Sequence, residues 1–229
     1  MYKILIVTLS LTVSIASLQA RSVRAIFLSP PKNAPKSAFL YTGSESLEVP
    51  LPTRNLSTSV KLPKGALTMA VLPNPLAEDA EVPKGAQIVK IPEQWTNCIM
   101  VFLPNAKNKI FPASVVVIDG SNAKFPLGET MIYNLTDQLF LGKFGSKSLT
   151  IKAWKSDKIK TRVQAGKRFY PVAIDCVAAD TQKRTALTRT NWIHYPEARQ
   201  ILFVTQLADQ KVPRVWGVLD HTKEAEKEE

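Results

Sequence analysis

Short apolar runs separated by turn residues dominate this chain and predict strands rather than helices. Residues 23–28, 38–41 and 47–51 are runs of strand length that end at Pro, Gly or Ser. The run 96–103 is apolar on both faces, which indicates a strand covered on both sides. Over 169–219 further runs follow at a spacing of about ten residues, as in β-sandwiches. The pattern predicts an all-β protein, either one immunoglobulin-like sandwich or two such units packed together.

An acidic, proline-containing segment at 73–83, PNPLAEDAEVP, is the boundary that the sequence predicts between two units. We expect an N-terminal β unit over 21–76 and a C-terminal β-sandwich over 84–221. A weak similarity between FLY at 39–41 and MIY at 131–133, each followed by a polar turn and short strands, also suggests two halves. The tail 222–229 is almost entirely Lys and Glu and is expected to be flexible.

The first twenty residues have the layout of a secretory signal peptide. Lys3 precedes an apolar run at 4–16, and Ser-Leu-Gln-Ala follows before Arg21. The run is too short to span a bilayer comfortably, although an uncleaved anchor is the alternative. We therefore expect cleavage after Ala20, export to the periplasm or medium, and no transmembrane segment in the mature chain.

The charge of the chain is strongly positive, with 30 Lys and Arg residues against 19 acids and a net charge of +11. A pI near 9.7 favours anionic partners, namely an anionic envelope component or an acidic protein. Export makes nucleic acid the least expected of these, and composition alone does not choose among the others. Nothing in the sequence predicts a cofactor.

Much of the positive charge lies in one segment, residues 143–168, which holds nine basic residues and a single acid, Asp157. Two runs within it, 148–153 and 158–163, alternate between apolar and polar residues and predict a β-ribbon with one core face and one cationic face. The candidate polyanion-binding residues are Lys152, Trp154, Lys158, Lys160 and Arg162. The basic side chains would contact the anionic groups, and the indole would stack on a sugar ring or base.

The same basic residues also have a purely structural interpretation. Outward lysines protect a sheet edge from aggregation and keep an exported protein soluble. An exposed Trp154 beside them would favour a ligand, whereas a buried one would make the segment mainly scaffold.

The two cysteines, Cys98 and Cys176, both lie in apolar runs of strand type. An even number of cysteines in an exported protein favours one disulfide, which would stabilise the fold by about 4 kcal/mol through the long loop it closes. Two buried free thiols are the alternative, since free cysteine is a common core residue.

No catalytic motif and no spacing of metal ligands stands out, so the sequence predicts a protein without catalytic residues or a metal site. Asp175, inside the apolar run VAIDCVA, is the acid that no turn explains. His194 lies at a strand end among aromatic residues. An enzyme would require one of these two to lie in a cleft, with a second polar group within hydrogen-bond reach.

The function expected from these features is that of an exported, non-enzymatic binding or structural module with a basic surface. Its length, export, high pI and two-sandwich layout resemble those of periplasmic pilus chaperones, and an assembly chaperone is the alternative. An exposed edge strand that offers its backbone to a partner would favour that alternative. An envelope hydrolase is the third hypothesis.

Overall fold

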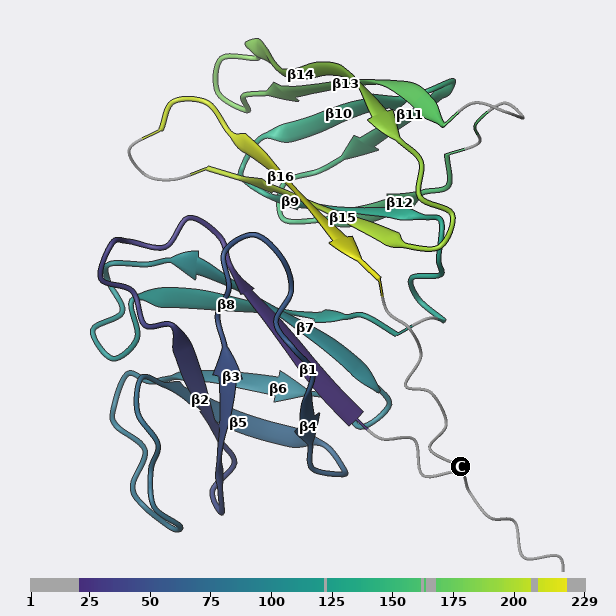
Figure 1. Cartoon of the computed structure of the whole chain (residues 1–229). Helices are drawn as coiled ribbons and strands as arrows, with labels where there is room; N and C mark the ends of the chain where they lie inside the picture. Colours follow the sequence, from purple (N-terminus) through teal and green to yellow (C-terminus); the bar gives the residue numbers. More distant parts are fainter. Residues whose placement is uncertain (1–20, 122, 162, 164–167, 207–209, 222–229) are drawn as a thin grey trace, which may run out of the picture.

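The computed structural model describes residues 21–121, 123–161, 163, 168–206 and 210–221, and the fold is all-β (Figure 1). Sixteen strands form four four-stranded sheets in this part of the chain, which confirms the all-β, sandwich-like architecture. No helix among these residues is long and apolar enough to cross a membrane. The expected signal peptide and charged tail lie outside the described residues.

The strands fall into two sets of eight. The first set is β1 (Arg21–Phe27), β2 (Ser37–Tyr41), β3 (Ser46–Pro50), β4 (Val60–Leu62), β5 (Leu67–Leu72), β6 (Gln87–Ile91), β7 (Asn97–Pro104) and β8 (Ala113–Asp119). The second set is β9 (Thr130–Leu135), β10 (Leu139–Phe144), β11 (Lys147–Ile151), β12 (Ser156–Ile159), β13 (Phe169–Val177), β14 (Arg184–Ile193), β15 (Arg199–Thr205) and β16 (Arg214–Asp220).

The second set repeats the topology of the first. The sheets of the first set have the orders β4-β1-β7-β8 and β3-β2-β5-β6, and those of the second have the orders β12-β9-β15-β16 and β11-β10-β13-β14. Even the parallel pair recurs, because β1 pairs with β7 as β9 pairs with β15. The chain therefore contains two copies of one eight-stranded sandwich, with the change from one to the other between β8 and β9.

This division differs from the expected units 21–76 and 84–221. The segment 73–83 lies between β5 and β6, which pair antiparallel within a single sheet. Its acids and prolines mark a loop that leaves a sheet and returns to it. A composition that disfavours regular structure does not distinguish such a loop from a linker.

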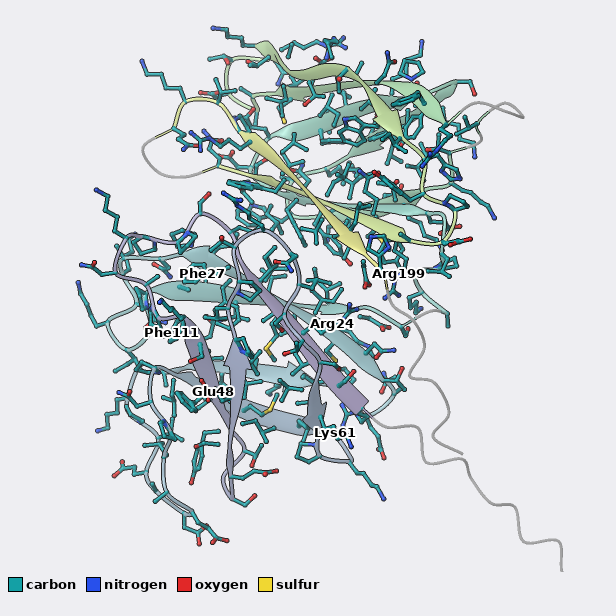
Figure 2. All side chains as sticks on the ribbon, in the orientation of Figure 1. Arg24, Phe27, Glu48, Lys61, Phe111 and Arg199 are labelled. Carbon is teal, nitrogen blue, oxygen red and sulfur yellow. The ribbon has the colours of Figure 1, made fainter. Side chains whose placement is uncertain are left out.

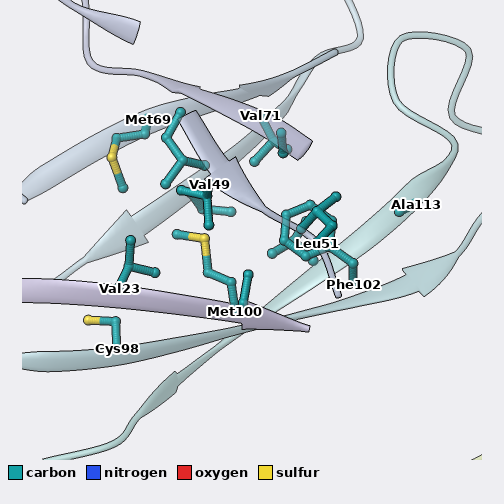
Figure 3. Packing of buried hydrophobic residues seen from close by; sticks show 14 of the residues in the cluster. Val23, Val49, Leu51, Met69, Val71, Cys98, Met100, Phe102 and Ala113 are labelled. Carbon is teal, nitrogen blue, oxygen red and sulfur yellow. The ribbon is translucent and has the colours of Figure 1, made fainter. Parts of the chain in front are cut away.

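The four sheets form four layers, with an apolar core between each adjacent pair (Figure 1). The first sandwich encloses the core around Met69, Met100 and Phe102, part of which is seen in Figure 3. The second encloses a core that includes Phe140 and Phe144. Between the sandwiches, the sheets that contain β1 and β15 pack face to face through residues that include Ile26, Ile99, Val101, Ile201 and Phe203.

Strand β7 contributes to two of these cores. Met100 and Phe102 point into the first sandwich, whereas Ile99 and Val101 point toward the second. All four are 0% exposed, which confirms that this strand is covered on both sides. Burial of apolar side chains on both faces contributes about 1.5–3 kcal/mol for each large side chain, so the junction is built like a core.

A buried ionic cluster accompanies the apolar contacts at the junction. Arg24 of β1 donates from Nη2 to Oδ2 of Asp220 at 2.9 Å, and Arg199 of β15 donates to the same carboxylate. Arg199 also donates from Nη1 to the carbonyl oxygens of Gly120, at 2.7 Å, and Phe125, at 3.1 Å. Figure 2 labels Arg24 in the first sandwich and Arg199 in the second, on either side of the junction. The cluster fixes both sandwiches and the segment that links them.

Candidate functional site

The basic segment 143–168 is a corner between two sheets rather than a ribbon. Strand β11 pairs with β10, and β12 pairs with β9, so the two strands are edge strands of different layers. The predicted core face is confirmed, because Ile151 and Ile159 are 2% and 6% exposed and share the second core. The predicted pairing was wrong because alternation identifies the buried face of a strand but not the neighbour that it pairs with.

At the turn 152–155 the chain passes from the sheet that contains β11 to the sheet that contains β12, and the side chain of the buried Asn134 is hydrogen-bonded to the start of this turn. This side chain is 0% exposed, and its Nδ2 donates to the carbonyl oxygens of Ile151, at 3.2 Å, and Lys152, at 3.1 Å. Its Oδ1 accepts a hydrogen bond from the hydroxyl of Thr136 at 2.7 Å. A buried amide with its donors and its acceptor engaged orders the turn.

Trp154 stands on this turn with 62% of its surface exposed. Its backbone has a φ of 57°, in the left-handed region that costs a residue other than glycine about 1–2 kcal/mol. The backbone N–H of Trp154 donates to the carbonyl oxygen of Thr136 at 3.2 Å, which helps to hold this conformation. The indole is thus displayed to solvent between Lys152 and Lys155 in the sequence, both of which are exposed. Exposure is the arrangement that a binding role for Trp154 requires.

The other candidate residues divide between the turn and β12. Lys152 belongs to the turn, while Lys158 and Lys160 lie at and beyond the far end of β12 and are exposed. Lys158 is engaged by the protein itself, since its Nζ lies 3.1 Å from Oε2 of Glu129. Arg162 lies outside the described residues.

The turn therefore brings together part of the predicted set and adds a residue to it. Lys152 and Trp154 share the turn with Lys155, which is one of the nine basic residues of the segment but was not among the candidates. Its proximity to Trp154 in the sequence was the available signal.

Cys98 and Cys176 are both free, so the structure has no disulfide between them. Cys98 lies in the core of the first sandwich and Cys176 in that of the second, with the junction between them. Burial raises the pKa of Cys98 to about 12 and that of Cys176 to about 11, which keeps both thiols protonated and unreactive at neutral pH. The expectation of a bridge failed because strand-like runs do not reveal which core each cysteine enters.

Asp175 is 2% exposed on β13 and is paired with two arginines of β14. Arg184 donates from Nε to its Oδ2 at 2.8 Å, and Arg189 donates to its Oδ1. Burial alone would raise the pKa of Asp175, but the hydrogen bonds and charges of the two arginines outweigh it and hold that pKa below its usual value. A carboxylate kept ionised by two cations is suited to joining strands rather than to proton transfer.

His194 lines an open cavity of about 410 Å³ together with His221, Arg168, Tyr195 and Glu197. In the part of the chain that is described, its side chain forms no hydrogen bond to a carboxylate or hydroxyl that would orient it as a base. Nor does any group of three or more His, Cys, Asp and Glu residues there have the arrangement of a metal site. The cavity brings together both histidines of the chain.

Strand β14 is the long edge strand that the chaperone alternative would use. It pairs with β13 on one side, and the register shifts between Ile174 and Asp175, so β14 carries one extra residue, Leu187. A bulge and outward charges such as Arg184 and Arg189 are the features by which proteins protect sheet edges from further pairing. This edge is therefore poorly suited to accepting a foreign strand.

Comparisons with known proteins give no family from which a function could be inferred, so the function is argued from the geometry of the sites. No protein-family model matches the chain, and no curated protein matches it. Among the groups described above, the turn at 152–155 is the one that combines an exposed aromatic side chain, flanking cations and a rigid support.

Proposed function

We propose that the protein is an exported, non-enzymatic binding module of the cell envelope or the extracellular space, and that it binds an anionic polysaccharide through the turn at 152–155. The observation that carries the proposal is the display of Trp154, which is 62% exposed in a left-handed backbone conformation and is supported by the buried Asn134. Backbone strain of this kind persists where the surrounding structure holds it, and it is concentrated at ligand sites.

The chemistry of the turn suits a charged sugar. The face of an indole packs against the apolar face of a sugar ring, and Lys152 and Lys155, which lie within two residues of Trp154 and are both exposed, would supply ammonium groups for carboxylate or sulfate groups. The charged units repeat along a polymer, so each polysaccharide chain offers many equivalent sites to this turn.

Export and the immunoglobulin-like type of sandwich are part of the proposal. Export is supported by the signal-peptide pattern of residues 1–20, and it predicts a mature protein that begins at Arg21. Intact-mass measurement of the protein from the producing cell tests this prediction, and an unprocessed chain that retains Met1 would contradict it. The immunoglobulin-like type is supported by two packed sheets per unit, although each unit has eight strands where the constant-type domain has seven.

Binding is tested by affinity electrophoresis and calorimetry with an acidic polysaccharide such as polygalacturonate, and with neutral dextran as the uncharged comparison. We expect Trp154→Ala to weaken binding by about tenfold, since one stacking contact contributes about 1–3 kcal/mol. The double variant Lys152→Glu/Lys155→Glu should abolish binding at about 0.15 M salt, where exposed charges still act over about 8 Å.

The matched control for the lysine variant is Lys32→Glu/Lys36→Glu, which makes the same change of net charge on exposed residues of the first sandwich. It should bind almost as the wild type does. An equal loss in this control would show that net charge alone drives binding, and unchanged binding of Trp154→Ala would remove the turn from the site.

A further inference from the structure

The internal repeat allows the two outermost sheet faces of the molecule to be compared. In the first sandwich, the connection from β5 to β6 folds back over the outer face of sheet β3-β2-β5-β6. Leu76 and Val82 of this connection pack against Tyr41, Ala70 and Leu72, which are at most 3% exposed. The backbone N–H of Leu76 donates to the hydroxyl of Ser46 at 2.9 Å, and that of Asp79 donates to the carbonyl oxygen of Gly43 at 3.1 Å. This outer face is therefore covered.

The equivalent face of the second sandwich has no such cover among the described residues. The equivalent connection, from β13 to β14, is a tight turn in which the N–H of Ala178 donates to the carbonyl oxygen of Lys183 at 3.1 Å. Among the described residues no loop packs on the outer face of sheet β11-β10-β13-β14, where the arginines of β14 cover Asp175 and the neighbouring Pro171 is exposed. Phe169, at the start of β13, is 60% exposed.

This outer face contains a basic groove. Lys143, Ala173 and Arg189 are cross-strand neighbours on β10, β13 and β14, so two cations flank a small side chain. A hollow of about 450 Å³ lies there and extends to Pro171 and Asn191. Since the side chain of Arg189 remains 51% exposed while it holds the buried Asp175, the groove presents positive charge to solvent.

The outer side of the covering loop has the opposite charge. Glu78, Asp79 and Glu81 are all exposed, and Asp79 occupies a tight bend with a φ of 56°. Leu76 and Val82 pack on the sheet and the N–H of Asp79 is hydrogen-bonded to Gly43, so the exposed acids at 78–81 form a held acidic tip, called here the acidic knob. The knob and the basic groove lie at opposite ends of the four-layer stack (Figure 1).

We propose that copies of this protein associate head to tail, with the acidic knob at 78–81 of one copy seated in the groove of the next, between Lys143 and Arg189. Because the two surfaces differ and lie at opposite ends, the contact is heterologous and leaves a knob and a groove unused at the ends of every assembly. The product is a linear stack rather than a closed dimer. This association needs neither the turn at 152–155 nor a polysaccharide, so it stands or falls independently of the proposed function.

The net charge of the protein governs the conditions for association. Copies that each carry a large positive charge repel at low ionic strength, whereas at about 0.15 M salt repulsion beyond about 8 Å is screened and close opposite charges still attract. We expect association to be greatest near that salt concentration and to fall at about 1 M.

Sedimentation equilibrium of the full mature chain at about 0.15 M salt tests the proposal. Over about 0.02–1 mM protein, the weight-average mass should rise to at least about twice that of the monomer without levelling off at the dimer, as for a weak open interface. The knob variant Glu78→Lys/Glu81→Lys and the groove variant Lys143→Glu/Asn191→Glu should each remain monomeric. Arg189 is retained in the groove variant because it supports Asp175.

Mixing the two variants is the decisive measurement. The basic knob of the first variant can then bind the acidic groove of the second, and the native knob of the second can bind the native groove of the first. Association should therefore return in the equimolar mixture. The charge-matched control Glu93→Lys/Asp157→Lys changes exposed residues outside both surfaces and should associate as the wild type does. Circular dichroism confirms that each variant is folded.

Two outcomes would overturn the proposal. A wild-type protein that stays monomeric at about 1 mM excludes the stack, as does a mixture of variants that fails to associate. If the chain stays monomeric while a synthetic peptide of residues 73–83 binds in the groove, the groove instead serves an acidic segment of a different protein.

Discussion

Replacing Asp220 by asparagine removes the negative charge that joins the two sandwiches. In the folded protein Arg199 is 0% exposed and donates to this carboxylate, which Arg24 reaches from the other sandwich. Removing one partner of a buried ion pair costs about 3–5 kcal/mol, because the remaining charge is left buried without its counterion. Arg199 keeps its hydrogen bonds to two carbonyl oxygens, so we expect a loss near the lower limit, about 3 kcal/mol.

The companion variant Arg24→Met removes the ion pair between the sandwiches but leaves the buried Arg199 paired with Asp220, so the two contributions to stability can be measured separately. Asp220 then keeps Arg199, and the side chain that is removed was 16% exposed. The cost should be that of a charged hydrogen bond, about 1.5 kcal/mol, which is half the effect of Asp220→Asn.

Urea unfolding at pH 7, followed by far-UV circular dichroism, measures both changes. With a slope of about 2.5 kcal/mol per molar urea, the midpoint should fall by about 1.2 M for Asp220→Asn and by about 0.6 M for Arg24→Met. The surface variant Asp157→Asn serves as the control and should leave the midpoint unchanged. A shift below about 0.3 M for Asp220→Asn would refute the view that Arg199 depends on this carboxylate.

Three further predictions concern single side chains. Asp175→Asn should destabilise the protein by about 1 kcal/mol at pH 7. The pKa of Asp175 in the folded protein lies below its ordinary value of 3.8, so the difference in unfolding free energy between variant and wild type should persist above pH 3.8 and vanish as the pH falls through the folded pKa. Urea unfolding from pH 7 to pH 2 measures this difference. Cys98 and Cys176 should react with a thiol reagent at pH 8 only after denaturant is added, because burial raises both pKa values; rapid reaction of the native protein would contradict their burial. Gly142→Ala should cost about 1–3 kcal/mol, since a Cβ there would lie 2.6 Å from the ring of Phe144, whereas Gly217→Ala, whose Cβ would lie 3.6 Å from its nearest neighbour, should be tolerated in thermal melts.

The sequence identified the strands and their buried faces more successfully than their partners. The apolar run at 96–103 correctly indicated a strand covered on both sides, because burial on two faces leaves a local signature. The basic segment was assigned the correct core face but an incorrect pairing, since β11 and β12 reach the same core from opposite layers. Pairing depends on contacts distant in sequence, which alternation does not encode.

The repeat was difficult to detect for a similar reason. The similarity between residues 39–41 and 131–133 aligned β2 with β9, one strand away from the correspondence of β1 with β9 in the sheet orders. Leu76 and Val82 were the signal that the acidic segment packs back on a sheet, because a solvated linker has no need of regularly placed apolar anchors. The ionic cluster left no local signal at all, as Arg24 and Asp220 are 196 positions apart.

The ion pair between Arg24 and Asp220 joins the two ends of the folded region at the junction of the sandwiches, although the two residues are 196 positions apart. Arg24 lies near the start of β1, and Asp220 is the last residue of β16. A circularly permuted chain, with residue 221 joined to residue 21 by a short flexible linker and new termini in the turn between β13 and β14, is therefore compatible with all four sheets. A fusion partner joined directly at residue 21 or residue 221 would enter at the side of the stack, away from its two outermost sheets (Figure 1).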